Sequence, residues 1–557
     1  MKFEEMPYKR VDLEEVKQEF TQLMQEFDAA ASGEEQFEVH KKYYRFSDHI
    51  QTEMTLANIR HDINMEDEFY NAENDYYDEM MPLLQNMMVQ YQQKLYNSPY
   101  RSYLEEKIGS VAFKNIELAM RAMDEKLIPL MQEENALTTR YNKILAGAKI
   151  DWNGEILNMS LMTPYLRSPD RAVRARAWEK LSGFLRDNEE EIEDIYDKLV
   201  KNRTAQAKEK GYDNYLPLGY DRMQRNCYDR GMVEEFRRQV KRDLVPFAEK
   251  LHERRRARIG VEKLSYIDEG VYFKNGNPNP TGNPAEILEA GRQMYRELSP
   301  ETGEFMDFMC DNNLFDVLGR KNKKTGGYMT YLPDYNSPFI FANFNGTNGD
   351  VDVITHECGH AFQGYLAGKD PIREHADITM ETAETHSMSM EYFTYRWAER
   401  FFGERGPEYR EMHFEDSVIF VPYGTMVDEF QDIVYSNPHF TPAERNQVWR
   451  DLEKQYKPHL DYTGNDYFER GCFWQRQHHI FNYPLYYIDY CIASVDALQY
   501  KRWMDKDYKA AWESYLKLCR LSASRFFTEL LPEVGLANPF EDGCIRDVIR
   551  DLEKTML

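Results

Sequence analysis

The sequence contains few of the residues that cross-link a folded chain or carry it through a membrane. Its seven cysteines are scattered and form no Cys-x-x-Cys pair, so they do not indicate a disulfide framework. No run of 18 apolar residues indicates a membrane span, and the N-terminus lacks the apolar segment of a secretory signal. We therefore expect a soluble, cytoplasmic protein.

Basic residues are also fewer than acidic residues. Lys and Arg total 70 against 96 Asp and Glu, which gives a formal net charge of −26. This excess argues against nucleic acid or an anionic membrane as a partner. Glycine (29) and proline (23) are sparse, and 42% hydrophobic with 30% charged residues is typical of a globular chain. A length of 557 residues exceeds the usual limit of one hydrophobic core, so more than one lobe is expected.

Helical periodicity dominates the chain. Apolar residues recur at helical spacing from residue 12 onward, with Asp12 as an N-cap. Asn153-Gly154 predicts a β-hairpin, and the segments 326–332 and 338–344 predict strands. We predict a mainly α-helical fold with a small β-sheet just before residue 351. We divide it into an N-terminal helical region (1–165) and a catalytic region (166–557) that pack as one body.

The segment VDVITHECGHAF, residues 351–362, carries the most specific chemistry. His356 and His360 are four positions apart, so on a helix both imidazoles lie on one face and can hold one metal ion. Glu357 then lies beside that ion, where it can take a proton from an attacking water. The pattern predicts a zinc hydrolase. An amphipathic helix with two incidental histidines is the alternative.

Two histidines need a third ligand and an open position to make a catalytic zinc site. The segment 376–393 predicts a helix with Asp377, Glu381, Glu384 and Glu391 on one face. Carboxylates on an otherwise apolar face are costly to bury unless a cation neutralises them. Spacing leaves Glu381 and Glu384 as rivals for the third ligand, with the others as partners that hold the imidazoles. A solvated acidic stripe is the alternative.

A second cluster, residues 478–490, is rich in histidine and tyrosine. Tyr483, Tyr486, Tyr487 and Tyr490 recur at the spacing of one helix face. Peptide hydrolysis builds negative charge on the carbonyl oxygen, and hydroxyl or imidazole donors stabilise that charge. An aromatic stripe in the core is the plain alternative for this segment.

Together these features resemble the zinc metallopeptidases of the thimet oligopeptidase and oligoendopeptidase F family. The resemblance is carried by HECGH, by an acidic residue 24 positions after its second histidine, and by the late His/Tyr segment. The stretches GGYMTYLPDYNSPFIFANFNGTNGDVDVITHECGHAFQ, HIFNYPLYYIDY and FFTELLPEVGLANPF are similar to the family's oligoendopeptidase branch. Within it, the likeness is strongest to the Pz-peptidases, which act on collagen-derived peptides.

The resemblance implies one zinc ion, bound by His356, His360 and Glu384, with Glu357 as general base and acid. It favours Glu384 over Glu381, because the family's ligand glutamate precedes a second acidic residue by seven positions. It also implies a set of residues that face the substrate. These are His479, Tyr486 and Tyr490 at the developing oxyanion, with Tyr487, Tyr483 and His478 nearby; in one alignment His478 takes the place of His479.

The implied fold is a prolate helical body with a deep central channel and a zincin-like catalytic core. The implied activity is hydrolysis of internal bonds in short, unfolded peptides. We expect Phe341, Ala342 and Asn343 to bind the substrate backbone, on the interpretation that 339–344 is an exposed edge strand. A zinc carboxypeptidase of similar helical fold is the nearest rival, and a catalytically silent peptide-binding protein is another.

Overall fold

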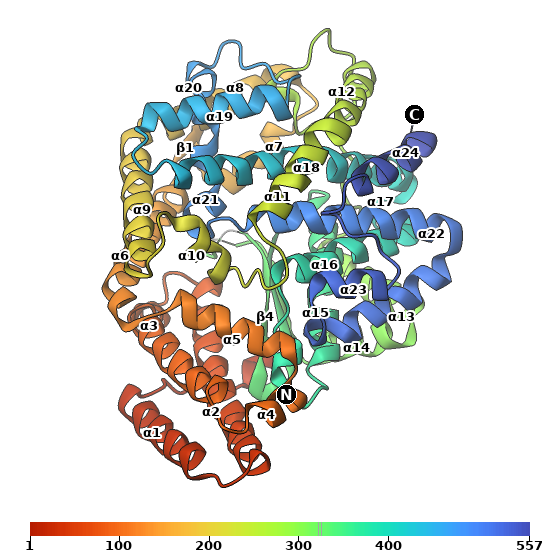
Figure 1. Cartoon of the computed structure of the whole chain (residues 1–557). Helices are drawn as coiled ribbons and strands as arrows, with labels where there is room; N and C mark the ends of the chain where they lie inside the picture. The colour runs from red at the N-terminus through yellow and green to blue at the C-terminus, as the bar shows by residue number, and fades with distance from the viewer. Residues whose placement is uncertain (321, 325, 557) are drawn as a thin grey trace.

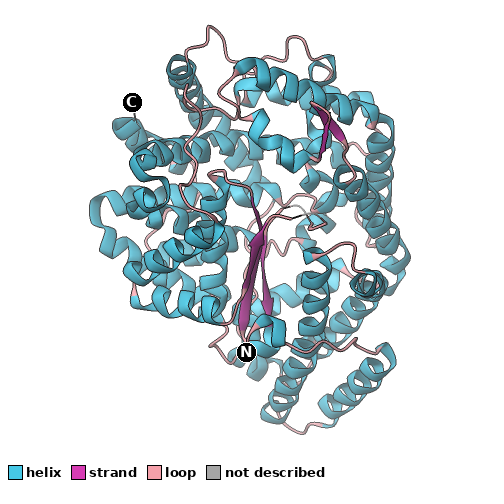
Figure 2. Ribbon diagram, turned by 180° about the vertical axis from the view of Figure 1, so that it is seen from behind, coloured by secondary structure: helices cyan, strands magenta, loops and turns pink. Residues whose placement is uncertain are grey.

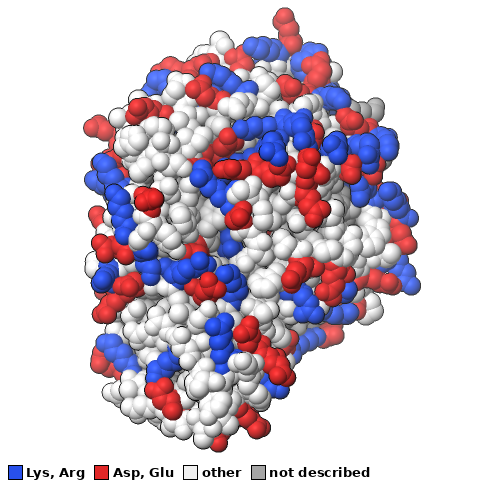
Figure 3. Space-filling view, in the orientation of Figure 1, with Lys and Arg blue, Asp and Glu red and all other residues white. Residues whose placement is uncertain are grey.

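Helices form most of the molecule in the computed structural model, which describes residues 1–320, 322–324 and 326–556 (Figure 1). Figure 2 shows the two small sheets as the only strands among the described residues. No described helix is long and apolar enough to cross a membrane. On the face seen in Figure 3, acidic and basic side chains are interspersed, so the acidic excess is spread there and not gathered in one patch.

The first five helices form the lower part of Figure 1 and have a core of their own, centred on residues such as Leu23, Tyr77 and Phe113. The predicted N-cap is confirmed, because the Asp12 carboxylate accepts from the amides of Glu14 and Glu15. The helices are α1 (Leu13–Ala29), α2 (Gly33–Ile63), α3 (Glu68–Tyr96), α4 (Arg101–Ile108) and α5 (Ser110–Ala122).

The next helices frame the predicted hairpin, β1 (Ile150–Trp152) and β2 (Glu155–Leu157), which pair antiparallel. Asn153 and Gly154 have φ of 57° and 88°, as a tight hairpin turn requires. The helices are α6 (Ile128–Ala146), α7 (Met159–Leu166), α8 (Arg171–Asp187), α9 (Glu189–Glu209), α10 (Tyr215–Arg222), α11 (Arg230–Gln239), α12 (Val245–Ile259), α13 (Pro284–Leu298) and α14 (Pro300–Asp311).

The last part of the chain supplies the helices of the catalytic core. They are α15 (Gly349–Ala367), α16 (Met380–Phe393), α17 (Ala398–Phe402), α18 (Gly406–Ser436), α19 (Pro442–Tyr456), α20 (Asp466–Glu469), α21 (His478–Asn482), α22 (Tyr487–Leu521), α23 (Phe527–Glu533) and α24 (Cys544–Met556). The largest hydrophobic core contains side chains of α6, of α24 and of many helices between them. It also includes Leu56 and Ile59 of α2. The N-terminal helices therefore pack into the rest; the division at residue 165 stays a prediction.

The three-stranded sheet corrects one prediction. Its strands are β3 (Phe315–Leu318), β4 (Tyr328–Leu332) and β5 (Ser337–Phe344), in the order β3-β5-β4. The segment predicted as an edge is thus the central strand, because a short strand, β3, covers its other side. Phe341 and Ala342 are completely buried, and the Asn343 amide donates to backbone oxygens of Lys324 and Gly326. These three residues therefore do not offer a free strand edge to a substrate.

Helix α15, which carries His356 and His360, crosses closely over α16, which carries Glu384. A Cβ on Gly359 would lie 2.6 Å from the Ser387 Cα and 3.1 Å from the His386 carbonyl oxygen. Only glycine permits this approach, since real Cβ contacts are not that short. Cys358 beside it is fully buried and serves as a small packing residue at the crossing.

We predict that Gly359→Ala destabilises the protein by about 1–3 kcal/mol, because the added methyl overpacks the crossing. Thermal unfolding measures the loss. Gly364→Ala, on the same helix, is the matched control: its Cβ would meet Tyr331 at an ordinary 3.5 Å, and alanine favours a helix. Equal melting temperatures for the two variants would contradict the close crossing.

Candidate metal centre and active site

His356, His360 and Glu384 converge as predicted. The two histidines project from α15 and the glutamate from α16. Their Nε2 atoms lie 3.3 Å and 3.5 Å from the same carboxylate oxygen, Oε2 of Glu384. All three donor atoms lie within 4.8 Å of one another. Two imidazole nitrogens and one carboxylate oxygen are a donor set that zinc prefers.

The outer nitrogen of His356 is held by a buried chain of side chains. Its Nδ1 lies 2.6 Å from Glu391 Oε1, and the other Glu391 oxygen lies 2.6 Å from His413 Nε2. The Tyr395 hydroxyl lies 2.6 Å from His413 Nδ1. Because Glu391 accepts the Nδ1 proton, the Nε2 lone pair of His356 is left to face the centre. Glu391 was among the predicted partners; His413 and Tyr395 were not.

The other predicted partners lie elsewhere. Asp377 precedes α16, which begins at Met380 and not at residue 376. Glu381 lies on α16 but accepts from the Thr379 hydroxyl and, at 3.4 Å, from the Tyr228 hydroxyl. The helix turns Glu381 toward the Tyr228 side and Glu384 toward the histidines, so the two rivals are separated by geometry.

Burial and hydrogen bonding shift the pKa values of the carboxyls at this site in opposite directions. Burial raises the pKa of the Glu391 carboxyl, but hydrogen bonds from His356 and His413 outweigh it and lower the pKa to about 2. Burial likewise raises the pKa of Glu384, and His360 with His356 holds it well below its usual range. Two buried carboxylates thus stay ionised beside a third, Glu357. Buried negative charge of this kind needs a cation, which fits a bound metal ion.

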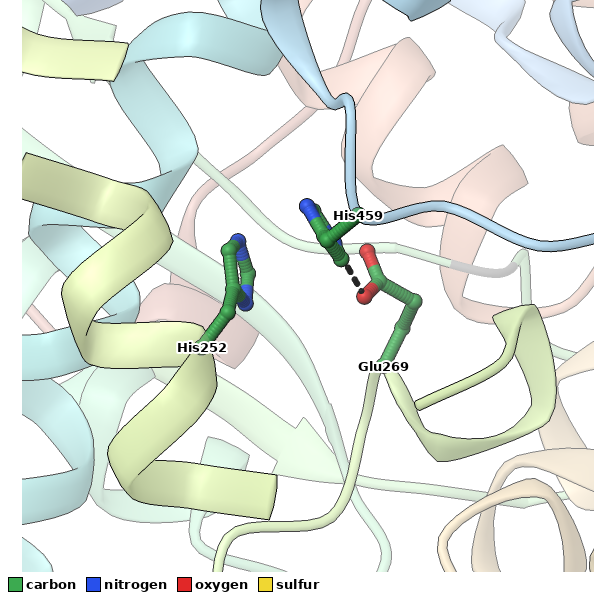
Figure 4. Close-up of side chains that lie close together, drawn as sticks. All are labelled: His252, Glu269 and His459. Atoms are coloured by element: carbon green, nitrogen blue, oxygen red, sulfur yellow. Dashed lines mark hydrogen bonds and ion pairs between the residues drawn. The ribbon is translucent and has the colours of Figure 1, made fainter. Parts of the chain in front are cut away.

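Two other groups of candidate ligands occur among the described residues. One is His252, Glu269 and His459, shown in Figure 4. There Glu269 already accepts from Lys457 at 2.5 Å and Arg255 at 3.1 Å, and Arg255 also contacts His252 Nδ1 at 3.0 Å. The two imidazoles stack with ring centroids 3.5 Å apart. Two cations at the carboxylate argue against a metal ion.

The remaining group is Glu189, Glu193 and Cys472. Arg470 pairs with Glu189 at 2.6 Å. Burial raises the pKa of the Cys472 thiol, so it stays protonated and is a poor ligand. Of the three groups in the described chain, the one on α15 and α16 fits a catalytic metal best.

The tyrosines of the second cluster reach this centre across a bend. α22 begins at Tyr487, so Tyr483 and Tyr486 precede it and the four do not share one helix face. The Tyr486 hydroxyl donates to Glu384 Oε1 at 2.5 Å, and the Tyr490 ring lies 4.8 Å from that of Tyr486. Tyr487 is buried, whereas Tyr483 is 58% exposed.

His479, and not His478, lies among these tyrosines. Its ring centroid is 4.9 Å from Tyr487, 5.9 Å from Tyr490 and 6.1 Å from Tyr486. His478 is exposed, and its ring is tilted by 32° against that of His479, with centroids 3.9 Å apart. The alternative that the sequence left open is therefore decided in favour of His479 as the neighbour of the tyrosines.

Two residues that the sequence did not reveal fix the tautomer of His479. The Tyr423 hydroxyl donates to Gln477 Oε1 at 2.7 Å, which orients the amide. Gln477 Nε2 then donates to His479 Nδ1 at 2.7 Å, so the ring proton is on Nε2. Burial lowers the pKa of His479 to about 3, and the neighbouring His478 adds to this. His479 is thus a neutral N–H donor.

Comparisons with known proteins find relatives that match the whole chain. Two family models match: the peptidase M3 N-terminal domain over residues 3–123 and peptidase family M3 over residues 304–548. A solved oligoendopeptidase F is 45% identical, with a TM-score of 0.97 over 100% of this chain and 98% of its own. Pz peptidase A with an inhibitor is 46% identical (TM-score 0.97; 100% and 99% covered). An oligoendopeptidase F from Bacillus anthracis is 41% identical (TM-score 0.92; 100% and 98% covered). No curated protein matches.

We predict that His413→Phe weakens Zn²⁺ binding about 10- to 100-fold, because Glu391 loses the donor that helps to hold it against His356. Competition with a chromophoric chelator measures the affinity. Tyr395→Phe removes only a hydroxyl one step farther out and is expected to have a smaller effect. Wild-type affinity in the His413 variant would mean that the chain beyond Glu391 does not support the ligand.

Proposed function

Because this chain belongs to peptidase family M3 and is a metallopeptidase, we propose that it is a zinc-dependent endo-oligopeptidase. Its substrates are short, unfolded peptides, cut at internal bonds. The observation that carries the proposal is the convergence of His356, His360 and Glu384, with Glu357 between the histidines in sequence and the Tyr486 hydroxyl on Glu384. The site thus combines three metal ligands, a general base and a hydroxyl donor.

Zinc would be held by His356, His360 and Glu384. When bound, it acts as a Lewis acid that makes water acidic enough to attack at neutral pH and polarises the carbonyl. Glu391 keeps the imidazole of His356 in the tautomer that leaves Nε2 free. Tyr486 occupies the other oxygen of Glu384, Oε1, so that Oε2 faces the histidines.

Glu357 serves as general base and then general acid. Its carboxyl lies on the same helix as the two histidines and is half-buried. Burial raises the pKa of Glu357, and the neighbouring imidazoles oppose this. A carboxyl with a raised pKa accepts a proton more readily near neutral pH, and it can return that proton to the leaving amine.

The oxyanion is stabilised by His479, Tyr486 and Tyr490. The Tyr486 hydroxyl has one proton, which it donates to Glu384 Oε1 in this structure and turns toward the oxyanion when the substrate binds. All three are uncharged donors held in a crowded pocket, where a hydrogen bond to a developing charge is worth more than in water. His479 presents its Nε2–H because Gln477 occupies Nδ1. Tyr487 is buried beside them, and the exposed Tyr483 and His478 are proposed to contact the substrate.

The substrate backbone pairs with β4. It is one of the two outer strands of the sheet, the longer of the pair with β3, whereas the predicted β5 is central. Backbone pairing gives affinity without strict selection of side chains, which suits an oligopeptidase. A deep channel around the site, which would admit short peptides and exclude folded proteins, remains part of the proposal, as do collagen-derived peptides as substrates.

The protein works in a reducing compartment such as the cytoplasm. All seven cysteines are free in the described structure, and five of them are buried. Cysteines kept as thiols are typical of cytoplasmic proteins.

We predict that Glu357→Gln lowers kcat by about 10²- to 10⁴-fold, because the amide cannot take the proton. The variant should keep its zinc, since Glu357 is not among the three ligands. Peptide hydrolysis and metal content are measured on the same preparation. Loss of zinc along with activity would make Glu357 a structural residue of the centre, and full activity would refute its role as base.

We predict that a peptide blocked by an acetyl group and an amide is cleaved at an internal bond. Mass spectrometry of the first products identifies the position. The same peptide with free ends is the control. If only the free peptide is cut, one residue at a time from its C-terminus, the chain is a carboxypeptidase.

A further inference from the structure

Leu485, the residue directly before Tyr486, has an unusual backbone conformation. Its φ is +68°, in the left-handed region that L side chains other than Asn and Asp rarely adopt. Its side chain is completely buried. Non-glycine residues in this region persist only where the surroundings fix them, and they gather at functional sites.

Both backbone polar groups of Leu485 are held by buried side chains from other elements. Its N–H donates to Gln431 Oε1 of α18 at 3.0 Å. Its carbonyl oxygen accepts from Arg225 Nη2, which lies between α10 and α11. Gln431 is fully buried and Arg225 is 6% exposed. The residue is therefore clamped at both ends.

The side chain of Leu485 is fixed as well. A Cβ added to Gly219 of α10 would lie 2.6 Å from Leu485 Cδ1, so the leucine packs directly on that helix. Arg225 is itself held over the rings of Tyr220 and Tyr228, at 4.2 Å and 5.7 Å from their centroids. Three separate elements thus enforce one unfavourable backbone conformation.

That conformation determines where Tyr486 points. Between α21 and α22 the chain bends at Leu485, and the next side chain reaches Glu384 Oε1. A change of Leu485 to an ordinary extended or helical conformation would turn the Tyr486 ring away from the centre. Donors at a reacting carbonyl act best when they are oriented before the substrate arrives.

We propose that Gln431 and Arg225 are positioning residues that hold Leu485 in the left-handed conformation and so orient the Tyr486 hydroxyl for catalysis. The inference rests on the proposed role of Tyr486 at the oxyanion. It assigns a positioning role to two residues that are distant from Tyr486 in sequence and contact neither the metal ligands nor Glu357.

A double-mutant cycle between Gln431 and Tyr486 tests the proposal. Gln431→Met removes the acceptor for the Leu485 N–H at similar volume, whereas Gln431→Glu keeps a carbonyl-type acceptor. Tyr486→Phe alone should lower kcat by about 10²- to 10³-fold, as loss of one oxyanion donor does. Gln431→Met should lower kcat by about tenfold with KM and zinc content unchanged. It should have almost no further effect in the Tyr486→Phe background, since coupled residues are not additive.

The conservative Gln431→Glu variant should restore most of the activity. If Gln431→Met is as active as wild type, or lowers kcat equally in both backgrounds, the clamp does not act through Tyr486 and the inference fails while the proposed function stands. If Tyr486→Phe is itself fully active, the proposed oxyanion role fails first.

Leu485→Val offers a second route if Gln431→Met does not fold. A β-branched side chain disfavours the left-handed region more strongly than leucine, while only one methylene of volume is lost. The same coupling to Tyr486→Phe is expected in kcat. Additive effects would overturn the inference independently of Gln431.

Discussion

The need to keep buried negative charge paired is the constraint on which the rest of the site depends. Glu357, Glu384 and Glu391 lie on two adjacent helices, and within the described structure Glu384 and Glu391 form their ion pairs with His356, His360 and His413. The fold meets this need through close approach. The crossing at Gly359 brings α16 within hydrogen-bonding reach of α15, α18 adds His413, and the bend before α22 adds Tyr486. The Nε2 atoms of His356 and His360 then face Oε2 of Glu384, which also accepts from the Ser387 hydroxyl, and this convergence of donor atoms suits a metal ion.

The sequence predicted this site as far as local geometry extends. His356 and His360 share a helix face by spacing alone, and Glu384 follows on the next long helix. Spacing could not separate Glu381 from Glu384, because the answer depends on which neighbours each side of α16 meets. The same is true of His413, Gln431 and Arg225, and of the contact that orients Gln477 through Tyr423. These contacts join separate segments, and no pattern within one segment reveals them.

The predictions that failed did so for related reasons. The apolar run in 337–344 predicts a strand but not its position in the sheet, and β3, which makes it the central strand, has only four residues. The tyrosines of 483–490 have helical spacing, but Pro484 lacks an amide hydrogen and restricts the residue before it, and Leu485 then takes a positive φ. Asp377 shares the helical spacing of Glu384, yet α16 begins only after Thr379. In each case a short interruption outweighed a regular pattern.

The two clusters of two histidines and one glutamate show how the surroundings decide the chemistry of identical side chains. At Glu269 the carboxylate is already neutralised by Arg255 and Lys457, so it does not need a metal ion to balance its charge. At Glu384 the neighbours are the hydroxyls of Tyr486 and Ser387 and two imidazoles, with no Lys or Arg in contact in the described structure, so its charge remains available to a metal ion. A ligand count treats the clusters alike. The difference lies in the charges of the residues that contact the glutamate. Basic side chains at Glu269 make a structural ion cluster, and their absence at Glu384 in the described structure leaves a centre able to bind a metal ion.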